Sequence, residues 1–134
     1  MTDSQSSAAA ERRFVVQHHV LREGEHWDLM LEKGEVLLTW QLADPPEQAA
    51  RRVVPATRIG DHRPVYLTYE GPVSDDRGEV HIVDRGTYEC VARSESTMRL
   101  MFHGQCLRGH YLLQQRGARG PNWVMRPEPA GGLP

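Results

Sequence analysis

Glycine, proline, aspartate and asparagine divide the chain into short stretches of strand-forming residues, and this division limits its possible folds more than any other feature. Several stretches alternate between apolar and polar residues, which is typical of strands with one buried face. No long run carries apolar residues at helical spacing. The pattern predicts an all-β domain, either a small closed β-barrel of about eight strands or a tightly curled sandwich. The expected strands are FVVQHHVL, HWDLMLE, VLLTWQL, PVYLTYEG, EVHIVDRGTYECVAR, TMRLMFHG, HYLLQQR and NWVMRP.

One segment departs from the strand pattern. In DPPEQAARR, Asp44 is expected to cap a helix of at most two turns, with proline at its first positions and Glu47 completing a capping box. The chain should therefore contain at most one or two short helices. Its 134 residues fit one domain. That domain is predicted at 13–126, between flexible tails at 1–12 and 127–134.

Charge and hydropathy exclude several classes of function. The chain has a formal net charge of −2, whereas proteins that bind nucleic acid regardless of sequence are normally basic. A local phosphate site remains compatible with that charge. No apolar run approaches the roughly 18–20 residues that a membrane span requires, and the N-terminus lacks the order of a secretory signal. We therefore expect a cytoplasmic protein with no membrane partner.

Three histidines and one aspartate lie close together in QHHVLREGEHWDLMLE. Side chains alternate along a strand, so Trp27 and the leucines that follow it are expected in the core. His26 and Asp28 then share the opposite face. A hairpin turn at the preceding Glu-Gly pair would return the first strand alongside the second.

That hairpin, with the first strand ending near His19, would bring a second imidazole to the same face as His26 and Asp28. His18 and His19 point to opposite faces, so only one of them can join the site. Two imidazoles and one carboxylate form a common ligand set for a divalent transition metal. From these residues alone, a hydrogen-bonded His–Asp pair at the surface remains an open alternative.

A second group of polar side chains occurs in GDHRPVYLTYEG. His62 and Tyr66 are separated by a proline that stiffens the chain, and Arg63 follows the histidine. An imidazole, a guanidinium and a phenol placed together form a cradle for a tetrahedral oxyanion such as phosphate. A place in the core is the open alternative for Tyr66.

Taken in order, these motifs resemble the 3′-phosphoesterase domain of bacterial DNA ligase D. The resemblance covers roughly Phe14 to Met125 and rests on FVVQHHVLREGEHWDLMLE, DHRPVYLTYEG, DRGTYE, HGQCLRGHYLL and NWVM. It implies a small closed barrel with a crescent-shaped cavity. It also implies a manganese-dependent hydrolase that trims DNA 3′ ends, cutting a terminal ribonucleotide back to a 3′-phosphate and then removing the phosphate.

The resemblance also assigns roles to individual residues. The metal ligands fall on His19, His26 and Asp28, and Mn²⁺ is the expected ion, although such ligands also accept Zn²⁺ or Co²⁺. His62 and Tyr66 fall on positions that hold the phosphate. We expect the cation to lie in the mouth of the barrel. The implied partners are DNA or DNA/RNA 3′ ends and a separate ligase or polymerase of end joining, at the nucleoid.

One position departs from the family pattern. An arginine that reaches the phosphate is expected two residues after the aspartate, where this chain has Met30. A thioether cannot donate a hydrogen bond to an anion, so Arg63 or Arg58 is expected to replace that arginine. Two functions stay open on this basis, a metal-dependent phosphoesterase and a non-catalytic module that binds metal or DNA ends. A third interpretation, a barrel with purely structural histidines, predicts a protein that ignores added metal.

Overall fold

Residues 12–128 are described by the structure, a computed structural model. The tails expected at 1–12 and 127–134 therefore lie almost wholly outside the described residues. The strands are β1 (Arg12–Leu21), β2 (Gly24–Lys33), β3 (Val36–Leu42), β4 (Val54–His62), β5 (Gly71–Pro72), β6 (Glu79–Arg93), β7 (Thr97–His103), β8 (Arg108–Gln115) and β9 (Asn122–Pro127). Two short 3-10 helices, η1 (Pro46–Ala50) and η2 (Pro64–Leu67), complete the fold.

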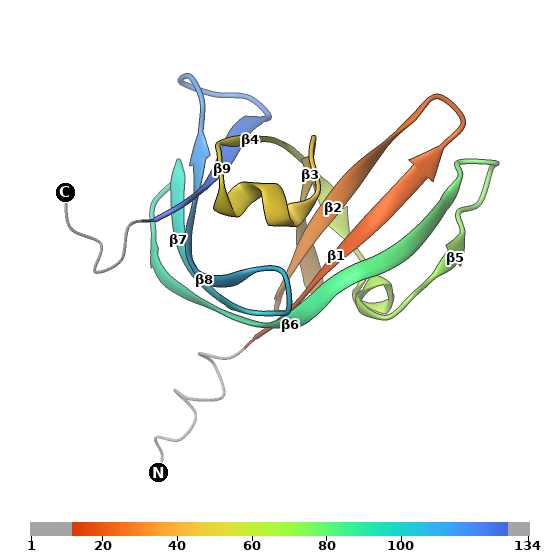
Figure 1. The fold of residues 1–134 in the computed structure, drawn as a ribbon, viewed down its shortest axis with the longest axis horizontal. Coiled ribbons are helices and arrows are strands. Elements are labelled where there is room, and N and C mark those ends of the chain that lie inside the picture. Colours follow the sequence, from red (N-terminus) through yellow and green to blue (C-terminus); the bar gives the residue numbers. More distant parts are fainter. Residues whose placement is uncertain (1–11, 129–134) are drawn as a thin grey trace, which may run out of the picture.

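The strands close into an antiparallel barrel, shown in Figure 1. Their order is β1-β2-β3-β4-β9-β8-β7-β6, and pairing of β1 with β6 completes the ring. The two-residue strand β5 pairs with the beginning of β6. The prediction of an all-β barrel is confirmed, and the sandwich alternative is excluded because the sheet closes on itself. Within residues 12–128, no helix is long and apolar enough to cross a membrane.

Apolar side chains from every barrel strand fill the barrel interior. Leu29 and Leu31 of β2 are fully buried there, as the alternation in HWDLMLE predicts. Trp40 is also buried in the interior, while Trp27 packs against the same cluster and is only partly buried. Each large side chain that leaves water contributes about 1.5–3 kcal/mol. The interior cluster is therefore the main source of the barrel's stability.

The helical segment predicted in DPPEQAARR is present but is capped differently. It forms η1, a 3-10 helix whose N-cap is Pro45, and no side chain caps it. Asp44 instead pairs with Arg52, with their charged atoms 3.2 Å apart. The capping prediction is wrong because a proline, which has no side-chain acceptor, occupies the position from which a cap would act.

The segment PVYLTYEG is not a strand. Pro64–Leu67 form η2, and only Gly71–Pro72 pair as β5. A proline cannot donate to a strand ladder but fits the first turn of a helix, which explains the difference. Conversely, the prediction missed β4, because the proline and glycine within Val54–His62 conceal a strand.

A second, smaller apolar cluster lies outside the barrel. Val15, Met30 and Leu37 alternate with inward-facing residues along their strands, and they are buried beneath Leu67 of η2. Figure 1 shows the β1–β2 hairpin and the beginning of β6 running past the barrel toward β5. The outer face of these strands is therefore covered by η2 and by the segment that contains β5, which together form the cover of the barrel.

Candidate metal centre

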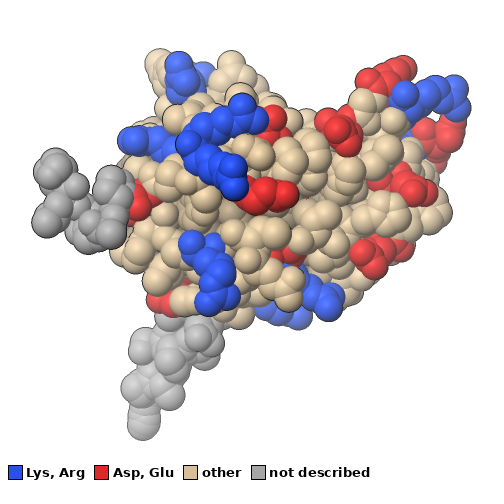
Figure 2. Space-filling view, in the orientation of Figure 1, with Lys and Arg blue, Asp and Glu red and all other residues tan. Residues whose placement is uncertain are grey.

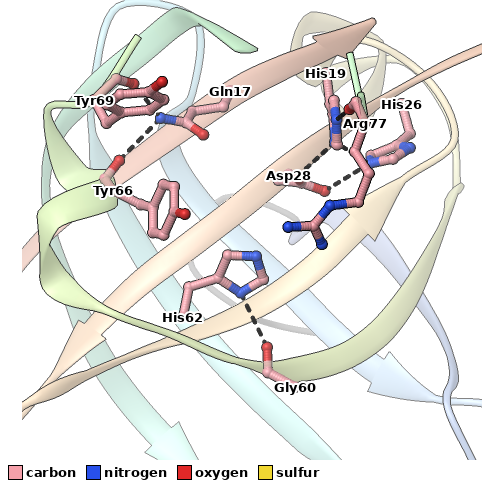
Figure 3. Close-up of polar contacts among 9 residues, drawn as sticks. All are labelled: Gln17, His19, His26, Asp28, Gly60, His62, Tyr66, Tyr69 and Arg77. Carbon is pink, nitrogen blue, oxygen red and sulfur yellow. Dashed lines mark hydrogen bonds and ion pairs between the residues drawn. The ribbon is translucent and has the colours of Figure 1, made fainter. Parts of the chain in front are cut away.

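His19, His26 and Asp28 meet on the β1–β2 hairpin, whose register places His19 directly opposite His26. Nδ1 of His19 lies 3.2 Å from Nε2 of His26. The carboxylate oxygens of Asp28 lie 3.2 Å from Nε2 of His26 and 3.8 Å from Nδ1 of His19. These ligand atoms all lie within 4.8 Å of one another. Figure 3 shows the three side chains grouped closely together, so they can share one ion.

The neighbouring histidine lies on the opposite face of β1. The ring of His18 stacks on Trp27 with 4.8 Å between ring centroids. Its Nε2 lies 2.7 Å from a carboxylate oxygen of Glu25. Strand alternation separates the two adjacent imidazoles as expected, and His18 takes no part in the cluster.

The cluster lies outside the barrel. Trp27 and Leu29 contact the interior, so the residues that alternate with them, His26 and Asp28, point outward. The expectation of a cation in the barrel mouth is therefore wrong. The same alternation that fills the interior places the ligands in the layer between the barrel wall and its cover.

Two buried carboxylates in this protein have opposite surroundings. Asp84 is 3% exposed and accepts three backbone N–H groups at 2.9, 2.7 and 2.7 Å, those of Arg85, Gln105 and Leu107. Asp28 is 4% exposed, yet its Oδ1 has no hydrogen-bond partner among the described residues. The His26 ring approaches this oxygen to 3.2 Å, but without hydrogen-bond geometry. A buried carboxylate oxygen without a donor is costly, and a bound cation would remove that cost.

The remote nitrogen of His19 is bonded to the backbone. Nε2 lies 2.7 Å from the carbonyl oxygen of Arg77, and because a carbonyl only accepts, Nε2 carries the proton. The lone pair of the ring is then on Nδ1, the atom that faces His26 and Asp28. Metal-binding histidines commonly donate their other N–H to a carbonyl in this way. The residues present therefore fit a divalent metal ion.

A cavity of about 290 Å³ is lined by two residues of the cluster, His19 and Asp28, and also by His62 and Tyr66. The two rings lie 5.7 Å apart between centroids, and Figure 3 shows them on the η2 side of the site. Nδ1 of His62 lies 3.1 Å from the carbonyl oxygen of Gly60, which leaves Nε2 for the cavity. Tyr66 also packs against the outer apolar cluster, so it is both a lining and a packing residue.

The two arginines expected to replace the family arginine lie elsewhere. The guanidinium of Arg63 lies 5.9 Å from the ring centroid of Tyr66 and lines a neighbouring cavity. The guanidinium of Arg58 lies 4.8 Å from the ring centroid of Trp40 and donates to backbone carbonyls of β3 and β4. Neither lines the cavity beside the cluster, whereas Met30 does.

Three further polar residues line this cavity, Gln17, Gln41 and Arg77, and the sequence pattern gave none of them a role there. Gln17 is 1% exposed, and its amide donates to the carbonyls of Tyr66 and Tyr69 at 3.0 and 2.6 Å, which ties the cover to β1. Its position two residues before His19, on the same strand face, was a usable signal. Arg77 comes from the turn between β5 and β6, where no periodic pattern indicates which residues face a site.

Comparison with known sequences agrees with this geometry. The model of the DNA ligase D 3′-phosphoesterase domain matches residues 17–115. The chain belongs to this family. The matched region contains the three clustered residues together with His62, Tyr66 and Arg77, so the resemblance noted from the motifs is confirmed.

Two mycobacterial proteins are similar to this chain over part of their own length. It is 29% identical over 127 residues to the multifunctional non-homologous end joining protein LigD of Mycolicibacterium smegmatis. It is 28% identical over 120 residues to the multifunctional non-homologous end joining DNA repair protein LigD of Mycobacterium tuberculosis. These alignments cover 84% and 83% of this chain but only 16% and 15% of the relatives. The chain thus spans about one sixth of their length.

Proposed function

We propose that this protein is a divalent-metal-dependent phosphoesterase that processes DNA 3′ ends during double-strand break repair. Its substrates would be strands that end in a 3′-phosphate or a 3′-ribonucleotide, and its product a 3′-hydroxyl end. The observation that carries the proposal is the buried Asp28 oxygen without a donor, facing two imidazole nitrogens beside a lined cavity. Membership of the 3′-phosphoesterase domain family supports the choice of substrate.

The ligands would be Nδ1 of His19, Nε2 of His26 and the carboxylate of Asp28, with Mn²⁺ as the proposed ion. A cation held there would polarise a phosphoryl oxygen and offset negative charge in the transition state. The backbone carbonyl of Arg77 keeps His19 in the tautomer that presents Nδ1 to the site.

The opposite side of the cavity would hold the phosphate. Nε2 of His62 faces the space, since Nδ1 is bonded to the carbonyl of Gly60. The imidazole, when protonated, donates to a phosphoryl oxygen, and the hydroxyl of Tyr66 donates to another. Gln17 holds the backbone around Tyr66 through its two hydrogen bonds, and the bond to Gly60 orients His62. Both donors are therefore positioned before a substrate arrives.

The direct test is end trimming with purified protein. A labelled primer–template ending in a 3′-phosphate or a single 3′-ribonucleotide is incubated with Mn²⁺, and the products are resolved by length and by terminal charge. Conversion to a 3′-hydroxyl end is expected, with none in the presence of a chelator. His26→Ala should abolish it, whereas His81→Ala should not, because His81 is exposed and pairs with Glu79. Failure of wild-type protein to trim with Mn²⁺, Zn²⁺ or Co²⁺ would contradict the proposal.

A second candidate function follows from Met30, which is 1% exposed and lines the cavity. Its thioether cannot supply the charged contact that an arginine would give. A protein that retains metal and DNA-end binding but does not turn over would be a non-catalytic module. Tight, metal-dependent binding of a 3′-phosphate end without product identifies that alternative. In either role we propose that the protein acts in the cytoplasm at the nucleoid, with a separate ligase or polymerase.

A further inference from the structure

Arg77 is the one residue with a permanent positive charge among the described residues that line the cavity. Figure 3 shows its guanidinium projecting between the metal cluster and His62. A guanidinium remains protonated at any physiological pH and presents five N–H donors in a planar fork. It therefore brings to the cavity the chemistry that Met30 lacks.

The backbone at Arg77 is fixed against β1. The carbonyl of Arg77 accepts from His19, and Gly78, with φ +80°, lies so close to β1 that a Cβ there would be 2.0 Å from the carbonyl oxygen of Val20. The amide of Val73 donates to the carbonyl of Gly78 at 2.8 Å. Because these contacts hold the turn from both sides, the side chain starts from a fixed point at the edge of the cavity.

The side chain of Arg77 is only partly engaged. Nε donates to the carbonyl of Ser74 at 2.8 Å, and Nη2 lies 3.4 Å from the hydroxyl of the same residue. In the part of the chain that the structure describes, no carboxylate forms an ion pair with it. Arg22, at the neighbouring hairpin turn, pairs instead with Asp76 at 3.1 Å. Arg77 therefore keeps N–H groups and a net charge for a ligand.

The surface around the cavity makes this charge more important. Figure 2 shows acidic side chains gathered at the end of the molecule that carries the β1–β2 and β5–β6 turns, with basic side chains there confined to one corner. Such a surface disfavours long-range attraction of DNA. A phosphate that enters must therefore be bound by groups within the cavity.

We propose that the guanidinium of Arg77 binds the terminal phosphate of the DNA 3′ end, as a binding residue that supplies the charged contact missing at position 30. This inference rests on the proposed function, because it names a phosphate contact of the same site. The ligand is a phosphate monoester, whose oxygens suit the planar fork of N–H donors. His19 depends only on the main chain of Arg77, so the two roles of this residue are separable.

The test compares two DNA strands bound to protein in the presence of Mn²⁺. One ends in a 3′-hydroxyl, and the other, called the phosphate-ended strand, ends in a 3′-methylenephosphonate, in which carbon replaces the bridging oxygen so that the proposed activity cannot remove the group. Arg77→Met keeps most of the length of the side chain but removes the charge, and Arg77→Lys restores a charge without the fork. We expect Arg77→Met to lose about 10–100-fold in affinity for the phosphate-ended strand, with Arg77→Lys intermediate. Affinity for the hydroxyl-ended strand should hardly change. Arg22→Ala, at the neighbouring turn, is the matched control and should resemble wild-type protein.

Manganese affinity, measured by calorimetry, provides the second readout. It should stay within about twofold of wild type in Arg77→Met, since the carbonyl that His19 bonds is retained. If wild-type protein prefers the phosphate end and Arg77→Met keeps the full preference, the inference about Arg77 is contradicted and the proposed function is not. If Arg77→Met loses manganese as well, Arg77 acts through the metal ligands and the inference is also overturned. If wild-type protein neither binds manganese nor prefers the phosphate end, the proposed function falls with it.

Discussion

Asp84 and Asp28 are both buried carboxylates on barrel strands, and their surroundings differ completely. Asp84 of β6 accepts three backbone N–H groups and holds the turn at residues 104–107 against the barrel. Asp28 of β2 has an oxygen with no donor and faces two imidazoles. Burial alone therefore does not separate a carboxylate engaged by the backbone from one that is available to a ligand. The number of hydrogen bonds that the carboxylate oxygens accept does separate the two. A site that binds a ligand must leave some of its donors or acceptors without a partner in the protein.

The largest expected effect is at Asp84, the carboxylate that accepts three backbone N–H groups. Asp84→Ala leaves buried N–H groups without an acceptor, each at a cost of about 1–3 kcal/mol. We expect a loss of about 3–5 kcal/mol in the free energy of unfolding, measured by urea denaturation. Glu79→Ala on the same strand is the control and should change stability by less than about 0.5 kcal/mol, because Glu79 is exposed. A stable Asp84→Ala protein would show that the turn is held by other contacts.

Asp28 should show the reverse, a large effect on metal binding and a small effect on stability. Asp28→Asn should weaken manganese binding by about 100-fold or more, since it removes a charged ligand. The metal-free protein should lose less than about 1 kcal/mol, because no hydrogen bond to Oδ1 is broken. Calorimetry and urea denaturation of the same sample measure the two effects. If metal-free Asp28→Asn unfolds as readily as Asp84→Ala, the distinction between the two carboxylates does not hold.

How far the sequence predicts this site depends on whether a residue lies on a regular strand. Alternation in HWDLMLE indicated the faces of His26 and Asp28, and the hairpin placed His19 opposite them. Alternation also predicted that His18 and His19 lie on opposite faces. These predictions succeed because strand geometry has a fixed period of two residues.

The rest of the site comes from irregular backbone, where no period applies. Arg77 follows Asp75 and Asp76, both with positive φ, and its contact with His19 joins residues 58 positions apart. The helix η2 also replaced an expected strand, and Arg63, at the N-cap of this helix, lines a neighbouring cavity. Side-chain direction in such segments is set by tertiary contacts, so the sequence pattern could not supply it.

A third, smaller effect on stability is expected in the cover, which consists of η2 and the segment that contains β5. Leu67 of η2 is 6% exposed and packs on the outer cluster. Leu67→Ala should cost about 2 kcal/mol, the low end for a buried leucine, because the surrounding cluster is small. Hydrogen exchange should accelerate at the amides of Tyr66 and Thr68, which bond within η2, and not in the barrel strands. Uniform acceleration across the barrel would mean that cover and barrel unfold as one unit.

The smallest effect concerns Glu32, which lies farther along the same outer face. A side-chain hydrogen bond from Arg13 holds the pKa of the Glu32 carboxyl below its ordinary value of 4.5. A lowered folded-state pKa means that this contribution to stability is complete above about pH 4.5 and is lost as the pH falls further. The side chains are 62% and 21% exposed, so its size is a few tenths of a kcal/mol.

Urea midpoints of wild-type protein and Glu32→Gln, measured from pH 7 to pH 3, test this contribution. Wild-type protein should be slightly more stable at pH 7, and the difference should disappear at the acid end. Equal differences at both ends would show that packing, and not charge, accounts for the pair.

The bond between His19 and position 77 uses a main-chain oxygen, which any amino acid supplies. A substitution at that position would therefore change the phosphate contact proposed for the side chain, while the main-chain acceptor that orients the imidazole of His19 is retained. The requirement for glycine falls on the next position, where a larger residue would collide with the adjoining strand. The backbone constraints at positions 77 and 78 thus leave the side chain of residue 77 free to vary without disturbing His19.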